Sequence, residues 1–368
     1  RPSQSECALQ ASDIEHLYLN EAENSLVFVD GHYSPELSKI VDQAALVIGN
    51  LPEFLSTHSA TLECHLGQYA TFENNVFSAL NTAFLRDAAL ILVPKNVSVT
   101  RPIHLLFIAT QQEVTSYPRC LLIGETGSNV TIIEDYVALQ DATYITNSVT
   151  EISLAANAHA RHIRVQRENT HAFHFANCAV SLAHASHYQS ASISLGSHIS
   201  RYNLDVRLLD EAAECIIDGL TLISDRQLAD THTCIDHVKP SGTSHQQHKC
   251  IVDDSAHAVF NGKIIVRPHA QRTNSSQSSR NLLLSSAAQI DTKPQLEIFA
   301  DDVKCAHGAT VGQLEQEEIF YLESRGLSEL AARNLLTYAF GAEIISRIPV
   351  TSLRQQLEQA VLNQTQGK

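Results

Sequence analysis

Methionine and tryptophan are both absent from this chain of 368 residues, and only 18% of its residues are charged. Because no initiator methionine is present, we expect the sequence to begin inside a longer gene product. No apolar stretch approaches the ~20 residues that a membrane-spanning helix requires, and no charged-then-apolar leader is present. We therefore expect no membrane association and a cytoplasmic location, or the plastid stroma if the source is a photosynthetic eukaryote.

Positive charge is also scarce, since 25 Lys and Arg residues stand against 40 Asp and Glu residues, and the net charge is −15. Without a run of Lys and Arg, a surface that binds nucleic acid is not expected. The chain has no G-x-x-x-x-G-K-[ST] motif to bind ATP through a P-loop, and no G-x-S-x-G elbow to carry a nucleophilic serine. If ATP drives the work of this protein, a partner must hydrolyse it.

The eight cysteines, from Cys7 to Cys305, include no CxxC pair, so we expect reduced and mostly buried thiols. The densest group of soft ligands is His232, Cys234, His237, His245, His248 and Cys250. Their spacing approaches that of a tetrahedral zinc site. Clusters arise by chance in a chain with 19 histidines, however, and alternate strand positions point to opposite faces. We expect these side chains to lie on strand faces rather than around a metal.

Short strands with regular corners dominate the middle of the chain. Small or polar corners precede strand runs at Gly127, Ala156, Ala185 and Ala212, and again, after wider gaps, at Asp254 and Ser286. The first four corners lie about 27–29 residues apart, which is a spacing typical of repeat architectures. This pattern favours a stacked coil of parallel strands, a β-helix, over a sandwich, although other all-β folds remain open at this point.

Helices are expected near both ends of this strand-rich region. Apolar spacing predicts an amphipathic helix over 72–84, before strands at 89–93 and 104–109. After Gly312 the composition becomes helical, with Ser328 as a candidate N-cap and Pro349 as a stop. We predict a polar or helical N-terminal remnant over 1–24, a β-helix core over 25–312 and a C-terminal helical domain over 313–368. The last domain would cap the coil, bind a partner, or do both.

The stretch from Ile290 to Leu314 carries the most specific chemistry. A strand from Leu296 that continues through Val303 would place Cys305 and His307 on one face, since alternate side chains share a face. A thiolate and an imidazole are both ligands for iron or zinc. Asp301, Asp302 and Lys304 lie beside them. The alternative is a packed thiol next to a hydrogen-bonded histidine.

The same stretch resembles a known family. The sequence ADDVKCAHGATVGQL at 300–314 is similar to the C-terminal signature of the SufD family, whose members are subunits of the SufBCD scaffold for iron–sulfur cluster assembly. Further similarity lies in LVFVDG at 26–31, AVFNGKIIV at 258–266, SSRNLLLS at 278–285 and ARNLLTYAF at 332–340. The family usually has a Trp-containing motif in an N-terminal helical region, and this chain lacks it.

The resemblance implies a mainly β fold, with a right-handed parallel β-helix core and a C-terminal helical domain that binds the ATPase subunit SufC. It implies that His307 holds a nascent iron–sulfur cluster opposite a cysteine of SufB, with Cys305 beside the same interface. The cluster would be transient and shared with SufB, and this chain would bind no nucleotide. Catalysis of ATP hydrolysis would belong to SufC.

Three classes of function are compatible with these observations. The first is a non-catalytic scaffold subunit working with SufB and SufC, which explains the most residues. The second is a carbohydrate-acting β-helix enzyme, which would need clustered carboxylates or a Ca²⁺ site. The third is a structural β-solenoid that assembles with copies of itself. A homodimer of the isolated chain is also expected to be accessible, because an exposed coil edge can pair with another copy.

Overall fold

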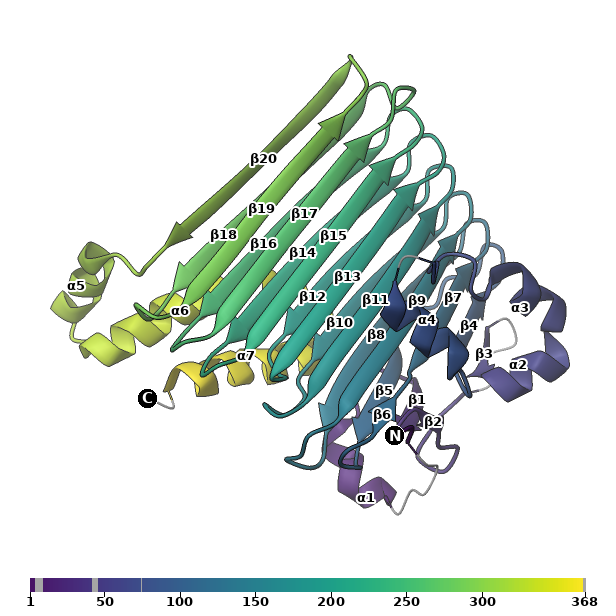
Figure 1. Ribbon diagram of the computed structural model, residues 1–368, viewed down its shortest axis with the longest axis horizontal. Helices are drawn as coiled ribbons and strands as arrows, with labels where there is room; N and C mark the ends of the chain where they lie inside the picture. Colours follow the sequence, from purple (N-terminus) through teal and green to yellow (C-terminus); the bar gives the residue numbers. More distant parts are fainter. Residues whose placement is uncertain (4–8, 42–45, 74, 367–368) are drawn as a thin grey trace.

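The computed structural model describes residues 1–3, 9–41, 46–73 and 75–366. Two long sheets of mainly parallel strands face each other and form a flattened solenoid, with helices at both ends of the chain (Figure 1). We name each sheet after its C-terminal strand, the β20 sheet and the β19 sheet. The predicted parallel β-helix core with C-terminal helices is confirmed.

The β20 sheet has the spatial order β2-β1-β5-β8-β10-β12-β14-β16-β18-β20. Its strands are Asn24–Val29 (β1), His32–Tyr33 (β2), Ile103–Ala109 (β5), Asn129–Ala138 (β8), His159–Gln166 (β10), His187–Ser194 (β12), Glu214–Ile223 (β14), Thr243–Val252 (β16), Thr273–Leu283 (β18) and Val303–Gly312 (β20). β1 and β2 pair antiparallel, and the later neighbours pair parallel.

The β19 sheet has the order β19-β17-β15-β13-β11-β9-β7-β4-β3, with β6 beside β9. Its strands are Val47–Asn50 (β3), Ala89–Val93 (β4), Thr115–Ser116 (β6), Arg119–Gly124 (β7), Ile145–Leu154 (β9), Phe173–Leu182 (β11), Ile199–Leu208 (β13), Leu228–His237 (β15), His257–Val266 (β17) and Gln289–Ile298 (β19). Each coil of the solenoid therefore contributes one strand to each sheet.

The first four corners predicted from the sequence are turns from the β19 sheet to the β20 sheet, whereas Asp254 and Ser286 lie in turns on the opposite edge of the solenoid. Gly127, Asn157, Ala185 and Ala212 all have positive φ, which is unfavourable for a residue with a side chain. Hydrogen bonds between successive coils offset this cost. The N–H of Asn157 donates to the carbonyl of His184 (2.9 Å), and the N–H of Ala185 donates to that of Glu211 (2.9 Å). Stacking of the corners thus stabilises a backbone conformation that each corner alone would avoid.

The lumen between the sheets is apolar in the first coils, holds buried charged groups such as Glu134 and Arg164 in the coils of β8 and β10, and is lined by uncharged polar residues in the coil of β18. In β18 the residues that point inward are Ser275, Gln277, Ser279 and Asn281, all buried. One coil earlier, in β16, His248 stacks on Phe260 with ring centroids 4.4 Å apart. Burial lowers the pKa of His248 to about 3, so this imidazole is neutral inside the fold.

The helix expected over 72–84 is shorter and faces the opposite way. It forms α4 (Val76–Ala83) and buries the polar residues Ser78 and Asn81 against the β19 sheet. Asn81 donates to the carbonyls of Pro118 (2.9 Å) and Asn147 (2.8 Å), which need donors because they are buried. Of the five apolar residues that predicted the helix, Phe77 is half-buried and stacks on Phe175, with ring centroids 4.0 Å apart. The other four are exposed; these are Phe72, Val76, Leu80 and Phe84.

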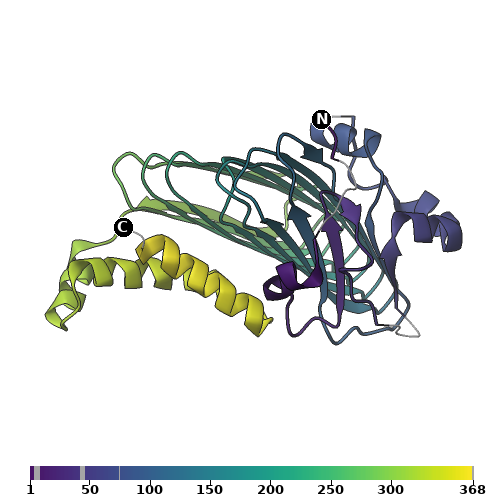
Figure 2. The same cartoon turned by 90° about the horizontal axis from the view of Figure 1, so that it is seen from below.

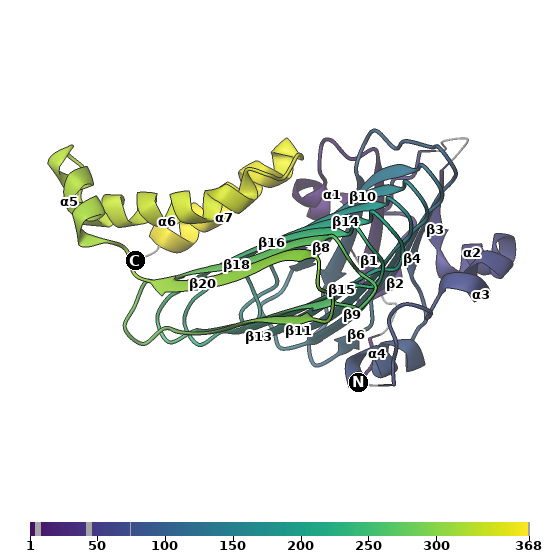
Figure 3. The same cartoon turned by 90° about the horizontal axis from the view of Figure 1, so that it is seen from above.

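The remaining helices of the N-terminal part are α1 (Ala11–Ile14), the 3₁₀ turn Glu15–Leu17, α2 (Leu51–Thr57) and α3 (Ser59–His65). The C-terminal helices are α5 (Gln316–Ser324), α6 (Glu329–Ile345) and α7 (Thr351–Gln366). Figures 2 and 3 show α6 and α7 running along the outer face of the β20 sheet, while α5 projects beyond it. Among the described residues, no helix is both long and apolar enough to cross a membrane.

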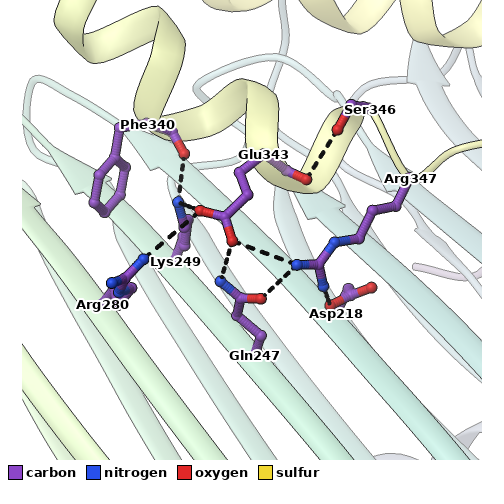
Figure 4. A network of polar contacts seen from close by, with 8 residues as sticks. All are labelled: Asp218, Gln247, Lys249, Arg280, Phe340, Glu343, Ser346 and Arg347. Carbon is purple, nitrogen blue, oxygen red and sulfur yellow. Dashed lines mark hydrogen bonds and ion pairs between the residues drawn. The ribbon is translucent and has the colours of Figure 1, made fainter.

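Helix α6 is fixed to the β20 sheet by apolar packing and by a polar latch (Figure 4). Glu343 pairs with Lys249, whose side chain is only 3% exposed, and accepts from Gln247 (2.7 Å). Arg347 donates to Asp218 (2.6 Å). The hydrogen bond from Lys249 lowers the pKa of Glu343 below its ordinary value. The latch therefore ties the helical region to strands in the centre of the sheet.

One sequence expectation about the last coil needs correction, because the strand before the Cys305 motif does not continue into it. That strand, β19, begins at Gln289 and contains Pro294. Proline is tolerated there because β19 is an edge strand, bonded to β17 alone among the described strands. The backbone also turns at 299–302, so β19 and β20 are separate strands in opposite sheets.

Candidate functional site

The predicted site residues Cys305 and His307 both lie in β20, the terminal strand of its sheet. β20 pairs with β18, and no other described strand covers its outer edge. Cys305 stands beside Ser275, and His307 stands beside Gln277. Since alternate residues of a strand share a face, both side chains lie on the same side of β20. The structure therefore brings the two together as the alternation predicted.

This shared side faces the lumen at its exposed C-terminal end. Cys305 is half-buried and packs against the apolar core between the sheets, which fixes the direction of its side chain. His307, on the same side, is exposed and makes no hydrogen bond or ion pair with any described residue. A thiol and an unpartnered imidazole thus lie side by side where the solenoid ends, within reach of another molecule that covers this end.

The electrostatics of the site favour a neutral thiol in the chain alone. Burial raises the pKa of Cys305 above its ordinary value, and a hydrogen bond from the backbone of Ser275 opposes this only in part. The thiol is therefore protonated at neutral pH. Because a thiolate is the form that binds metal, a metal at this position must displace the proton as it binds.

The neighbouring charges predicted from the sequence do not converge on the pair. Asp301 and Asp302 lie in the turn before β20, where the N–H of Asp302 donates to Gln271 (2.9 Å). Lys304 occupies the alternate position of β20 and so lies on the outer face. The site within the described residues therefore consists of one thiol and one imidazole, with polar lumen residues behind them.

Apolar side chains surround the free edge of the last coil. Ile298, Phe299 and Val311 are all large apolar residues and all exposed, Phe299 by 58%. They flank an edge whose backbone groups have no partner strand among the described residues. A long unpaired edge next to exposed apolar residues is a surface suited to pairing with another sheet.

Comparisons with known proteins identify the family. The model of the SUF system FeS cluster assembly SufBD core domain matches residues 107–340, and the model of the SufBD protein N-terminal region matches residues 11–105. The chain belongs to the SufBD family. The resemblance to SufD stated from the sequence is thereby confirmed, and the process that the family model names is iron–sulfur cluster assembly.

Similar curated proteins support the same assignment. The chain is 43% identical to an iron–sulfur cluster assembly SufBD family protein of Synechocystis over 96% of this chain and 81% of that protein. It is 36% identical to the iron–sulfur cluster assembly protein SufD of Escherichia coli, over 90% of this chain and 77% of that protein. It is 33% identical to the chloroplastic protein ABCI7 of Arabidopsis thaliana, over 77% and 61% respectively.

The second group of candidate ligands disperses in this SufBD fold, as strand alternation predicted. His232 and Cys234 lie on the outer face of the β19 sheet, His245 lies on the outer face of the β20 sheet, and His248 and Cys250 point into the lumen. Across the described ranges, no group of three or more His, Cys, Asp and Glu residues is placed to hold a metal. The seven described cysteines are all free; Cys7 lies outside the described residues.

Sequence reasoning missed the lumen residues that stand behind the site. Gln277 and Ser275 are the register partners of His307 and Cys305, and both are buried. They precede the site by one coil, so no local motif connects them with it. The unbroken run of polar residues at 273–281 is the signal that could have indicated a polar lumen in this SufBD chain, because such a run is polar on both faces of the strand.

Proposed function

We propose that this chain is a non-catalytic scaffold subunit for iron–sulfur cluster assembly, which pairs with SufB and holds the nascent cluster at their interface. One observation carries the proposal. Cys305 and His307 share the lumen-facing side of an edge strand that no other described strand pairs with, at the end of the solenoid. The family supports iron–sulfur cluster assembly as the process.

The chemistry of Cys305 and His307 fits a site that binds an iron–sulfur cluster transiently. Two side chains cannot complete the coordination of an iron–sulfur cluster, so thiolates from a partner must supply the rest. His307 would be one ligand, and Cys305, once deprotonated by the incoming metal, would lie beside the same interface. A neutral imidazole is a weaker donor to iron than a thiolate, so mixed ligation favours release of the cluster.

SufB would cover the free edge, because the sequence resemblance implies that the cluster lies at an interface between this chain and SufB. The unpaired strands β19 and β20, with exposed Ile298, Phe299 and Val311, would meet an equivalent end of the partner. In the absence of SufB the same edge would pair two copies of this chain, which makes a homodimer the expected state of the isolated protein.

The C-terminal helices would bind the ATPase subunit SufC. Phe320 and Tyr321 of α5, which projects beyond the sheet, and Leu330 and Leu335 of α6 are exposed apolar residues. Movement of α6 on nucleotide binding by SufC would reach the β20 sheet through the contact of Glu343 with Lys249. The bacterial and chloroplastic relatives accord with a cytoplasmic or stromal location.

Replacing His307 with alanine tests the proposed site. We expect the tagged chain, co-expressed with SufB and SufC, to retain both partners because the His307 side chain is exposed and its removal leaves the core of this chain intact. Iron and sulfide in the purified complex should fall at least about tenfold, since the partner's ligands alone would not retain the cluster. Lys304→Ala, on the outer face of the same strand, is the control. Full cluster loading of His307→Ala would refute the role of His307.

Replacing Phe320 with aspartate tests the surface proposed for SufC. The side chain is 71% exposed, so the isolated chain should remain as stable as the wild type. A buried charge in the interface should weaken SufC binding by at least about 2 kcal/mol, about thirtyfold in Kd, while SufB still co-purifies. Glu317→Lys, on the same helix, controls for a general effect of charge. Retention of SufC by Phe320→Asp would place the ATPase elsewhere.

A further inference from the structure

Three side chains form a hydrogen-bonded ladder in the lumen, behind the proposed ligand. Gln246 Nε2 donates to Thr233 Oγ1 (2.7 Å), and Gln277 Nε2 donates to Gln246 Oε1 (2.8 Å). Each amide therefore gives its N–H to the preceding member of the ladder and offers its carbonyl oxygen to the next. The ladder has a direction, and the carbonyl oxygen of Gln277 stands at its end.

That carbonyl oxygen is buried without a donor. The side chain of Gln277 is 2% exposed, and its Oε1 finds no hydrogen-bond partner among the described residues. Buried acceptors are nearly always paired, because leaving one without a donor costs free energy. In the next coil, the residue in register with Gln277 is His307, which lies on the same lumen-facing side. The fold thus puts an imidazole that lacks partners beside an acceptor that lacks a donor.

The opposite sheet is shaped to hold Gln277 in this place. Gly262 of β17 faces it, and a Cβ atom at Gly262 would collide with the amide nitrogen of Gln277. The ring of Phe260 also borders this space. Any larger residue at 262 would displace the amide of Gln277 from Gln246. The glycine therefore leaves room for the amide in the orientation that the hydrogen bond to Gln246 requires.

We propose that Gln277 is a positioning residue for His307. Its carbonyl oxygen accepts a hydrogen bond from one ring nitrogen of His307, so that the other ring nitrogen presents its lone pair at the end of the lumen. Histidines that bind metals generally donate their second N–H to a carbonyl or carboxylate, which fixes both the tautomer and the orientation of the ring. The inference rests on the proposed role of His307 as a ligand, and its test needs no iron.

The test measures the tautomer of His307 in the iron-free chain. The ¹⁵N chemical shifts of both ring nitrogens are recorded on protein labelled at histidine, at about pH 8.5, where an ordinary imidazole is neutral. The signals of His307 are assigned by their loss in His307→Gln. In Gln277→Met, which keeps the shape and removes the acceptor, we expect the tautomer ratio to change by roughly threefold to tenfold.

Two control variants and one alternative variant make the result specific. Gln277→Glu keeps an acceptor oxygen and should retain the wild-type tautomer preference. Ser275→Ala removes a buried hydrogen bond from the same face of the same strand, next to Cys305, and should leave the ratio unchanged. If Gln277→Met folds poorly, Gln277→Asn withdraws the carbonyl by one methylene and gives the same readout.

An unchanged tautomer ratio in Gln277→Met and Gln277→Asn would overturn the inference, as would an equal change in Ser275→Ala. The result is independent of the proposed function. A shifted ratio together with full cluster loading of His307→Ala would support the hydrogen bond and refute the role of His307 as a ligand. An unchanged ratio together with loss of the cluster in His307→Ala would refute the hydrogen bond and support the role of His307 as a ligand.

Discussion

Replacing Glu151 with alanine is expected to lower the free energy of unfolding by about 3–5 kcal/mol, the largest effect of any single substitution considered for stability. Glu151 and Arg119 form an ion pair whose side chains are 0% and 1% exposed, with 2.5 Å between Oε2 and Nη2. The carboxylate also accepts from the backbone N–H groups of Gly67, Tyr69 and Ala70. Its removal leaves a buried guanidinium and three backbone donors without their acceptor.

Urea unfolding followed by circular dichroism would measure this loss. Limited proteolysis should also cut faster at 67–70, because Glu151 accepts three backbone N–H groups of this stretch. Glu125→Ala is the matched control, since Glu125 is an exposed glutamate that accepts from one backbone N–H, that of Lys95. Its cost should stay within about 1 kcal/mol. A loss of under 1 kcal/mol in Glu151→Ala would contradict the prediction.

The second large expected effect is a decrease in the free energy of unfolding as the pH falls, because two buried histidines are neutral in the folded chain. Burial lowers the pKa of His248 to about 3 and that of His237 to about 4, whereas both titrate near 6.5 in an unfolded chain. Below about pH 6.5 the unfolded state therefore binds protons that the folded state does not. Each such histidine lowers the free energy of unfolding by about 1.4 kcal/mol per pH unit, or about 2–3 kcal/mol between pH 6.5 and 4.5.

Removing one of these groups should flatten the pH profile. In His248→Leu, the free energy of unfolding measured from pH 8 to pH 4.5 should fall less steeply than in the wild type, by up to about 1.4 kcal/mol per pH unit. His245→Leu is the control, because His245 lies on the same strand but is exposed, with its ring bonded to Ser276. Parallel profiles for the wild type and His248→Leu would show that His248 does not remain neutral when buried.

Local pattern explains why parts of the site could be predicted. Strand alternation alone places residues 305 and 307 on one face, and the structure agrees. The same rule puts His232 and Cys234 on one face of β15, and His248 and Cys250 on one face of β16. Alternation does not say which face is the lumen, however. Contact of Cys305 with the core decides that, and it depends on how β20 stacks on β18.

For helix α4, the apolar spacing predicted the helix but not the face that the helix buries. Ser78 and Asn81 form its buried side. A helix normally buries its apolar stripe because that removes the most apolar surface from water. Here the surface beneath offers buried carbonyl groups at Pro118 and Asn147, and hydrogen bonding to them decides the orientation. Those carbonyls belong to segments far along the chain, so the helix sequence could not indicate them.

The sequence by itself determined the features that depend on neighbouring residues: short alternating strands, corners at a regular interval, helices after Gly312 and a shared face for Cys305 and His307. Only the tertiary structure decided which distant groups meet. Gln277 lies beside His307, and Arg119 meets Glu151 across 32 residues, because parallel coils stack each strand on one from the preceding coil. That stacking is set by register between coils, a long-range property that local propensity does not encode.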